Sequence, residues 1–172
     1  MTTFLKNRDM KFSFHLLLAC IALTACGESG KTTADYRIVP CPGEIAPGDG
    51  GDFELDARTR IVCTGDNDGM RANAEFLAGY VESVVGSAPE ITGPDGLCDD
   101  GRAVILRADA PGKGGEAYEI EVSENRITVS GESDAGVFYG IQTLRKAMGA
   151  AKAAKVLFPA VRIADEPYLG YR

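Results

Sequence analysis

A run of alternating apolar and polar residues between positions 118 and 130 limits the folds open to this chain more than any other feature. Its apolar positions are Tyr118, Ile120, Val122, Ile127 and Val129. Because successive side chains of a strand point to opposite faces, a period of two predicts strands with one buried face. The polar stretch 123–126 separates the two halves and predicts a tight turn. The sequence therefore predicts a β-hairpin that packs its apolar face against other elements.

A first helix is predicted between residues 66 and 86. Asp66, Asn67 or Asp68 can accept hydrogen bonds from the free N–H groups of the first turn, and Gly86 suits the residue that follows a helix. The apolar residues between them recur at helical spacing, at Met70, Ala74, Leu77, Val81 and Val84. This spacing predicts one buried stripe packed against a sheet.

The second predicted helix follows the hairpin, beginning at Ser133 or Asp134 and ending before Gly149. Its buried stripe is predicted to consist of Val137, Ile141, Leu144 and Met148. Gly136 and Gly140 lie four residues apart on one side of this helix. Because glycine destabilises a helix, two glycines in this register indicate that a neighbouring segment comes close to the helix backbone.

Shorter apolar segments predict the remaining strands. Three of them are short, at 37–40, 53–55 and 60–63. The fourth, at 103–107, has an unbroken apolar centre, which is typical of a strand covered on both faces. Together these elements predict an α+β fold, with a small mixed or antiparallel sheet and two helices packed on one face.

The first 26 residues have the pattern of a lipoprotein signal. Three basic residues precede an apolar run over 12–25, which is too short to span a membrane. The run ends in Leu23-Thr24-Ala25-Cys26, which resembles a bacterial lipobox, where the cysteine thiol is acylated and the chain is cut just before it. Cys26 is therefore the predicted lipid-attachment residue. A looser match ends at Cys20, and a plain secretion signal is the alternative.

Cleavage before Cys26 would remove His15, the only histidine of the chain. The mature protein would then have no imidazole for a catalytic triad, a general base or a metal site. Three positive charges and one negative charge would leave with the signal, so the formal charge would change from −7 to −9. Since nucleic acids require a basic surface, this acidic balance argues against a nucleic-acid partner.

Four cysteines would remain after cleavage: Cys26, Cys41, Cys63 and Cys98. If Cys26 carries a lipid, the other three allow at most one disulfide. Their separations of 22 and 35 residues match no metal-ligand pattern. Cys41 and Cys63 both fall in predicted strands and can pair if those strands are neighbours; three unpaired thiols are the alternative.

Three further patterns contain chemistry-bearing residues, and each favours a structural interpretation. The loop 64–69 with Glu75 has some calcium-loop positions, but it begins with Thr and follows a strand, which favours a helix cap. Gly112-Lys113-Gly114-Gly115 lacks the spacing of a phosphate loop and favours a connector. Pro167 favours extended geometry at Glu166, and in extended structure the neighbouring side chains of Asp165 and Glu166 point to opposite sides. The sequence therefore predicts no catalytic residue, no cofactor-binding residue and no metal ligand.

The segment over the hairpin and the second helix resembles a known domain. It contains Ala117-Tyr118-Glu119-Ile120-Glu121-Val122 and, further on, Ala135-Gly136-Val137-Phe138-Tyr139-Gly140-Ile141-Gln142-Thr143-Leu144. With the opening Ile38-Val39-Pro40-Cys41-Pro42 and the ending Asp165-Glu166-Pro167-Tyr168-Leu169-Gly170-Tyr171-Arg172, it is similar to the N-terminal domain of β-N-acetylhexosaminidases of glycoside hydrolase family 20. The resemblance spans about residues 36–172. Related domains precede the catalytic barrels of families 67, 84 and 89.

The resemblance implies a parent enzyme that removes terminal N-acetylglucosamine or N-acetylgalactosamine from glycans by substrate-assisted retaining catalysis. In this family an Asp orients the acetamido group of the substrate and the following Glu is the acid/base, and both lie in the barrel. Neither Asp165-Glu166 nor Arg172 inherits a role in catalysis or sugar binding, and no catalytic residue of the family maps onto this chain. What maps is the supporting domain, which is expected to pack on the barrel.

The expected organisation has four parts. These are a lipoprotein signal peptide over 1–25, a flexible tether over 26–34, the α+β domain over 35–164 and the start of a junction over 165–172. The final aromatic residues look like the beginning of another strand, so we expect a truncated chain whose partner is its own catalytic barrel. The lipid on Cys26 would hold it at the bacterial cell envelope, on a periplasmic or outer-membrane surface. A free-standing lipoprotein that binds a protein or a glycan is the alternative.

Overall fold

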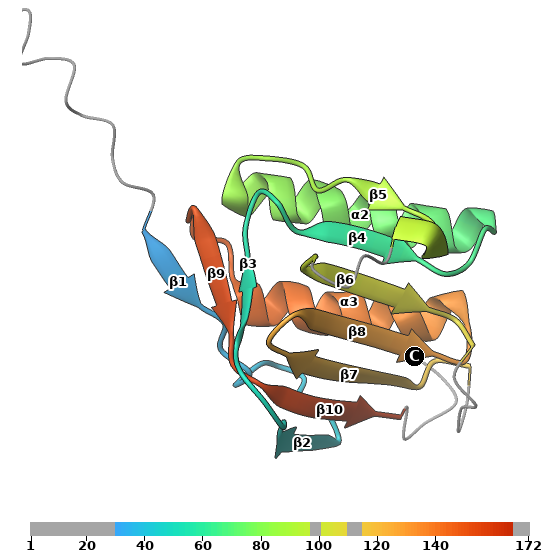
Figure 1. Cartoon of the computed structure of the whole chain (residues 1–172). Coiled ribbons are helices and arrows are strands. Elements are labelled where there is room, and N and C mark those ends of the chain that lie inside the picture. Colours follow the sequence, from blue (N-terminus) through green and yellow to red (C-terminus); the bar gives the residue numbers. More distant parts are fainter. Residues whose placement is uncertain (1–29, 97–100, 110–114, 167–172) are drawn as a thin grey trace, which may run out of the picture.

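The computed structural model describes residues 30–96, 101–109 and 115–166. Two β-sheets and two α-helices make up this part of the chain, which confirms the predicted α+β class (Figure 1). The strands are β1 (Lys31–Thr33), β2 (Glu44–Pro47), β3 (Phe53–Leu55), β4 (Arg60–Cys63), β5 (Ile91–Thr92), β6 (Ala103–Arg107), β7 (Tyr118–Ser123), β8 (Arg126–Gly131), β9 (Lys155–Phe158) and β10 (Val161–Asp165). The helices are α2 (Asp68–Val85), the 3-10 turn η1 (Pro94–Gly96) and α3 (Asp134–Met148).

The larger sheet has seven strands in the order β2-β10-β7-β8-β6-β4-β5. It is mixed, because β2, β10, β7 and β8 pair antiparallel while β8, β6, β4 and β5 pair parallel. Helix α2 packs against β4, α3 packs against β7 and β8, and the two helices contact each other. Both α-helices therefore cover the same face of the sheet, as predicted, and no α-helix of the described residues covers the opposite face, which we call the helix-free face (Figure 1).

The predicted hairpin is confirmed as β7 and β8. Ile120 lies opposite Val129 and Val122 lies opposite Ile127, so the apolar side chains meet on the helix-covered face. All four are at most 1% exposed, whereas Glu119 and its neighbours in alternate positions face the open side. The buried Tyr118 hydroxyl forms a 2.6 Å hydrogen bond with the Thr143 hydroxyl of α3, which ties the hairpin to the helix.

The predicted helix ends are also confirmed. Asn67 precedes α2, and its side chain accepts a hydrogen bond from the Met70 N–H at 2.8 Å. Ser133 precedes α3 and accepts from the Gly136 N–H. Gly86 follows α2 with a φ of 85°, the left-handed conformation that ends helices. Every member of the two predicted stripes is buried.

Glycines allow α3 to lie very close to the hairpin. A methyl group built on Gly136 would overlap the Ala117 carbonyl oxygen, and one on Gly140 would come within 2.5 Å of a Val129 methyl. One on Gly131, at the end of β8, would lie 2.6 Å from the Val137 nitrogen. These distances are shorter than van der Waals contact, so the predicted close approach is confirmed.

Strand β6 is covered on both faces, as its apolar run predicts. Val104 and Leu106 join the main core beneath the helices. Ala103 and Ile105 form a second small cluster with Val62 of β4 on the other face. The turn η1 contacts β4 and lies in the connection between β5 and β6.

A smaller sheet in the order β1-β9-β3 closes the left end of the domain in Figure 1. Residues Lys31–Thr33, which fall in the expected tether, pair parallel with β9, and Ala34 after them is buried. The ordered domain therefore begins earlier than the sequence indicated. The short polar segment Lys31–Thr33 has no alternation of apolar and polar residues. It forms a strand through backbone pairing with a distant segment, and the local sequence pattern does not predict such a strand.

An ion network joins this smaller sheet to its surroundings. Glu54 of β3 accepts hydrogen bonds from Lys155 of β9 at 2.7 Å and from Arg102 at 3.2 Å, and Lys31 of β1 lies 3.8 Å away. Asp56 pairs with Arg58 at 3.0 Å and with Arg102 at 3.5 Å. We call these six residues the Glu54–Asp56 network.

The strand predicted at 37–40 is wrong. Its residues pair with no strand, and they are fixed by irregular contacts instead: the Lys146 ammonium donates to the Val39 carbonyl, and the neighbouring Tyr36 hydroxyl donates to the Pro159 carbonyl. Pro40 and Pro42 lack backbone donors, which weakens any ladder at this position. Cys41 therefore lies in a loop and not in a strand.

The main core spans Ala34 to Ile163, so a chain that starts at residue 27 contains the whole core. No helix within the described ranges is both long and apolar enough to cross a membrane. Several predictions lie outside the described residues. These are the signal peptide over 1–25 with Cys26, the thiol of Cys98, the connector over 112–114 and the junction from 167 onward.

Substitution of two glycines tests the close packing of α3. We expect Gly136→Ala to lower the free energy of unfolding by about 1–3 kcal/mol, because the new methyl group overlaps a backbone carbonyl that cannot turn aside. The control is Gly79→Ala on α2, where nothing lies within 4 Å of the added methyl. It should stabilise the domain by up to about 1 kcal/mol, through helix propensity. Urea denaturation measures both; equal effects would contradict the packing argument.

Acid titration tests the Glu54–Asp56 network. The hydrogen bond from Lys155 holds the pKa of Glu54 below its ordinary value of 4.5. Burial alone would raise the pKa of Asp56, but hydrogen bonds from Arg58 and the charge of Arg102 hold it below 3.8. The folded state thus binds protons more weakly than the unfolded state, and its stability should fall as the pH drops below about 4.5.

The variant Glu54→Gln isolates this contribution. Its free energy of unfolding should fall less steeply with pH than that of the wild type, measured by urea denaturation between pH 5.5 and pH 3. Glu121→Gln removes an exposed carboxylate from the helix-free face and should keep the wild-type slope. A wild-type slope in Glu54→Gln would show that the network does not govern acid sensitivity.

Candidate docking surface

The residues of the calcium-like loop and of the Asp165-Glu166 pair have structural positions in the fold. Asn67, inside the calcium-like loop, caps α2, and Thr64 in the same loop donates to the Leu106 carbonyl at 3.1 Å. Asp165 is the last residue of β10 and accepts a hydrogen bond from the Gly43 N–H, while Glu166 is exposed. Across residues 30–96, 101–109 and 115–166, no group of three His, Cys, Asp or Glu side chains is placed to hold a metal ion.

The two described cysteines are free thiols. Cys63 ends β4, is buried, and its thiol donates to the Gly65 carbonyl at 3.1 Å. Cys41 is exposed in its loop. Of the two alternatives for these residues, the structure has the unpaired one.

Polar contacts hold α2 and α3 parallel to each other. Near their N-terminal ends, the buried Asn73 side chain donates to the Asp134 carbonyl at 2.8 Å, and Asn67 donates to the Asp134 carboxylate. Near their C-terminal ends, the Tyr80 hydroxyl donates to the Gly149 carbonyl at 2.7 Å. The Arg145 guanidinium lies over the Tyr80 ring, 5.6 Å from its centre. The helix pair is therefore one rigid layer on the sheet.

The outer side of this layer exposes aromatic rings. Phe76 of α2 is 40% exposed and Phe138 of α3 is 37% exposed, and their ring centres lie 5.5 Å apart. Tyr139 extends the group, 6.0 Å from Phe138. Ala72, Gly79 and Ala135 lie one helical turn from the two phenylalanines and are exposed as well, so the rings stand above small neighbours. We call these six residues the helix-pair surface.

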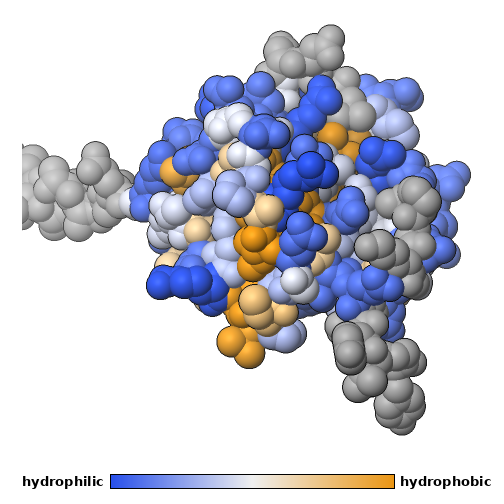
Figure 2. All heavy atoms as spheres, turned by 90° about the horizontal axis from the view of Figure 1, so that it is seen from below, coloured by the Kyte–Doolittle hydropathy of each residue, from blue (hydrophilic) through white to orange (hydrophobic). Residues whose placement is uncertain are grey.

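An exposed aromatic pair on small neighbours is suited to docking. Two rings in contact bury apolar area at their edge but leave their outer faces in water. A partner that covers them removes that apolar area from water. The side of the domain that is seen from below in Figure 2 exposes apolar residues as well, and they form a strip among polar atoms. Val39, at 85%, is the most exposed of the large apolar side chains described.

The two predicted stripes do not include Phe76 or Phe138, and the sequence did not predict that these residues form a surface. The signal was present in their register. Phe76 immediately precedes Leu77 and Phe138 immediately follows Val137, and one residue along a helix is a turn of about 100° away from the buried stripe. Only the pairing of the two helices shows that these off-stripe rings meet.

The helix-free face has a different character. A shallow hollow of about 740 Å³ lies over β10, β7 and β8 and is lined mainly by polar groups. Arg162 lies opposite Glu121, which in turn lies opposite Thr128, and Arg107 pairs with Asp109 at 3.0 Å. None of its described lining residues is aromatic, so this part of the lining offers no ring on which a sugar could stack.

Fold and surface together define a class of protein: an α+β domain with a mixed sheet, one helix-covered face and an exposed aromatic pair on the helix layer. The chain belongs to a known family of this class, because residues 35–166 match the model of glycosyl hydrolase family 20, domain 2. The resemblance to family 20 is therefore confirmed.

Relatives of known identity agree with this assignment. A β-N-acetylhexosaminidase of Cellulomonas fimi is 28% identical over 138 residues, covering 80% of this chain and 27% of the relative. A β-hexosaminidase of Porphyromonas gingivalis is 28% identical over 177 residues, covering 94% of this chain and 22% of the relative. The chain thus spans about a quarter of the length of these curated relatives.

Solved structures show the same fold. The family 20 β-N-acetylhexosaminidase from Streptomyces coelicolor A3(2) superposes with a TM-score of 0.67 at 23% identity, over 80% of this chain and 28% of that chain. A family 20 β-N-acetylglucosaminidase superposes with a TM-score of 0.58 at 32% identity, over 80% of this chain and 24% of that chain.

The double variant Phe76→Ser/Phe138→Ser tests whether the helix-pair surface is an exposed apolar patch. We expect clearly weaker retention on a hydrophobic column and less fluorescence from a bound hydrophobic dye. The free energy of unfolding should fall by about 2–4 kcal/mol, because more than half of each ring is buried and that apolar burial is lost. Ile45→Ser/Ile91→Ser removes two side chains of equal exposure from the two edge strands of the larger sheet and is the matched control. Equal retention of the two variants would argue against a continuous patch.

Proposed function

We propose that this chain is the non-catalytic N-terminal supporting domain of a lipid-anchored bacterial β-N-acetylhexosaminidase, whose catalytic barrel packs on the helix-pair surface. The parent enzyme would remove terminal N-acetylhexosamine residues from glycans at the cell envelope. The observation that carries the proposal is the match to domain 2 of family 20 over residues 35–166. The names of the matched relatives, hexosaminidases about four times as long as the aligned domain, support it.

The helix-pair surface supports the docking part of this proposal. Phe76 and Phe138 expose apolar area to water, and a barrel packed over them would remove that area from water. Because part-buried hydrogen bonds join α2 and α3 near both ends, docking would cost little ordering of the domain. The domain would thereby stabilise the barrel without contributing a group to the reaction.

The reading frame beyond the Arg172 codon is the most direct test. We expect it to continue into a barrel that contains an adjacent Asp and Glu, the pair that substrate-assisted catalysis requires. A stop codon directly after Arg172 would contradict the supporting role. Incorporation of radioactive palmitate into the protein in growing cells, and its loss in Cys26→Ser, tests the lipid anchor separately.

Hydrolysis of an aryl N-acetyl-β-glucosaminide tests whether this domain is non-catalytic and the barrel carries the activity. Residues 27–172 should show no turnover above a blank, whereas the longer gene product should be active. In that longer product, Phe76→Ser/Phe138→Ser should shorten the half-life of activity at elevated temperature several-fold and leave kcat/KM at 25 °C nearly unchanged. Ile45→Ser/Ile91→Ser should leave both quantities unchanged. Turnover by residues 27–172 alone would overturn the proposal.

The polar hollow on the helix-free face favours a second candidate, a free-standing lipoprotein that binds a glycan or a protein. The arginines and carboxylates that line it offer hydrogen bonds to hydroxyl and acetamido groups. Saturable binding of N-acetylglucosamine oligosaccharides in calorimetry, weakened by Arg162→Ala, would favour this candidate over the supporting role.

A further inference from the structure

The Glu54–Asp56 network is unbalanced in charge. Two carboxylates, Glu54 and Asp56, face four cations: Lys31, Arg58, Arg102 and Lys155. The network therefore carries two excess positive charges, in a chain whose formal charge is −7. A positive cluster on an acidic protein is an uneven distribution of charge, and it marks one end of the domain as different from the rest.

The cations of this network lie outside and the carboxylates lie inside. The Asp56 side chain is 8% exposed and that of Glu54 is 23% exposed. The Arg58 side chain is 78% exposed and that of Lys31 is 51% exposed. A partner that approaches the Glu54–Asp56 network therefore meets ammonium and guanidinium groups before it meets either carboxylate of the network, and an anionic partner is favoured.

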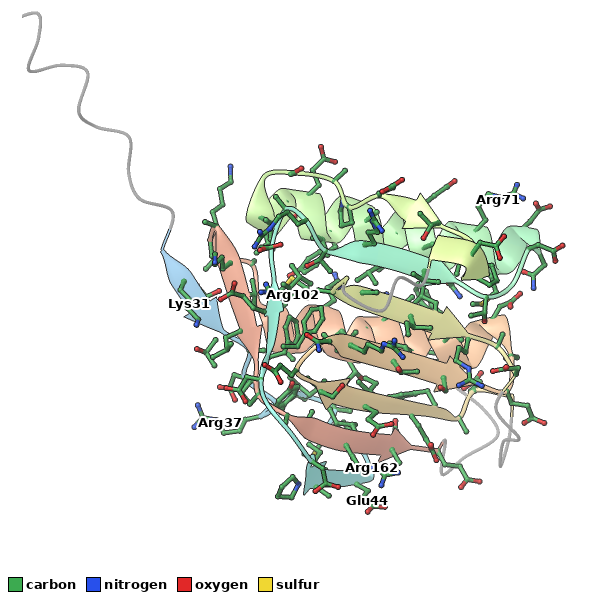
Figure 3. All side chains as sticks on the ribbon, viewed as in Figure 1. Lys31, Arg37, Glu44, Arg71, Arg102 and Arg162 are labelled. Atoms are coloured by element: carbon green, nitrogen blue, oxygen red, sulfur yellow. The ribbon has the colours of Figure 1, made fainter. Side chains whose placement is uncertain are left out.

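The cationic end coincides with the start of the folded chain. Lys31 belongs to β1, and its strand is fixed by parallel pairing with β9. Lys31 and Arg102 both lie at the end of the molecule that carries the smaller sheet (Figure 3). The predicted lipid attachment at Cys26 is five residues before Lys31, a stretch that spans at most roughly 17 Å when fully extended. A lipid at Cys26 would hold this end of the domain close to a bilayer.

We propose that the surface formed by Lys31, Arg58, Arg102 and Lys155 binds the headgroups of anionic lipids in the membrane to which the protein is attached. This inference rests on the proposed lipid attachment. Each cation near an anionic bilayer strengthens the attraction several-fold, and the attraction decays within a Debye length. The acidic remainder of the domain is repelled by the same bilayer, so the attached domain turns its smaller sheet toward the lipid. None of the six residues of the helix-pair surface takes part.

Sedimentation with lipid vesicles tests this inference. The protein is residues 27–172, which contain the whole core and lack Cys26, so its binding reports the surface and not the anchor. Vesicles of phosphatidylcholine with 40 mol% phosphatidylglycerol should bind it in 20 mM salt, and pure phosphatidylcholine vesicles should not. Raising the salt to 300 mM should abolish the binding, because exposed charges are screened. Equal binding to both kinds of vesicle, or none to the anionic ones, would overturn the inference.

Two double variants with the same change in net charge locate the binding. Lys31→Gln/Arg58→Gln removes the two most exposed cations of the network and leaves Glu54 and Asp56 their other partners. It should weaken partition onto anionic vesicles at least about tenfold. Arg71 lies at the end of the domain opposite Lys31 (Figure 3), and Arg107 is the last residue of β6. Arg71→Gln/Arg107→Gln removes these two exposed cations and should weaken the partition less than about twofold. Equal loss in both variants would show that net charge alone governs binding, and would overturn the inference.

These results are separable from the proposed function. If either variant melts at a lower temperature than the wild type, the variants no longer test the surface. The wild-type protein then tests it, through the dependence of its binding on salt and on the phosphatidylglycerol fraction. If the protein binds anionic vesicles but incorporates no palmitate in cells, the proposed cationic surface is supported and the proposed lipid attachment is contradicted. If the protein is lipidated in cells but does not bind anionic vesicles, the lipid attachment is supported and the inference about the cationic surface is overturned.

Discussion

The close packing of α3 on the β7–β8 hairpin is the interaction on which the rest of the structure depends. Gly131, Gly136 and Gly140 remove the side chains that would otherwise separate the helix from the strands. The buried hydrogen bond between the hydroxyls of Tyr118 and Thr143 fixes the helix along the strand direction. Because packed interiors tolerate little change in volume, a helix this close to a sheet has one position and not a range of positions.

The position of α3 then determines that of α2. Asp134 at the start of α3 accepts hydrogen bonds from Asn67 and the buried Asn73, and Gly149 after its end accepts one from Tyr80. A parallel helix pair fixed at both ends presents an outer surface of constant shape. The exposed rings of Phe76 and Phe138 meet on that surface because of contacts made on the other side of the helices.

Charge is distributed in the domain as unevenly as apolar area. The Glu54–Asp56 network concentrates cations at the smaller sheet, where the first strand of the domain begins, and the helix layer carries the exposed aromatic rings. Two surfaces with different chemistry thus lie on different elements of one small fold. Such a separation would let a domain contact a bilayer and a neighbouring domain at the same time.

Much of the central architecture could be predicted from the sequence, because local chemistry sets it. Helix caps, stripes and the hairpin each depend on residues within a few positions of one another, as at Asn67, Ser133 and the alternation from Tyr118 onward. The candidate surface could not be predicted in this way. Phe76 and Phe138 are 62 positions apart, and each has an ordinary place on its own helix.

The sequence by itself determined the α+β class, the two helices with their ends and buried stripes, the hairpin, and the close approach at Gly136 and Gly140. Only the tertiary structure decided that β1 pairs with β9, that β10 lies between β2 and β7, and that residues 37–40 form no strand. The physical reason is the range of the forces involved. Periodicity and capping act over one or two turns of chain, whereas strand pairing joins backbone groups more than 100 residues apart, whatever their side chains.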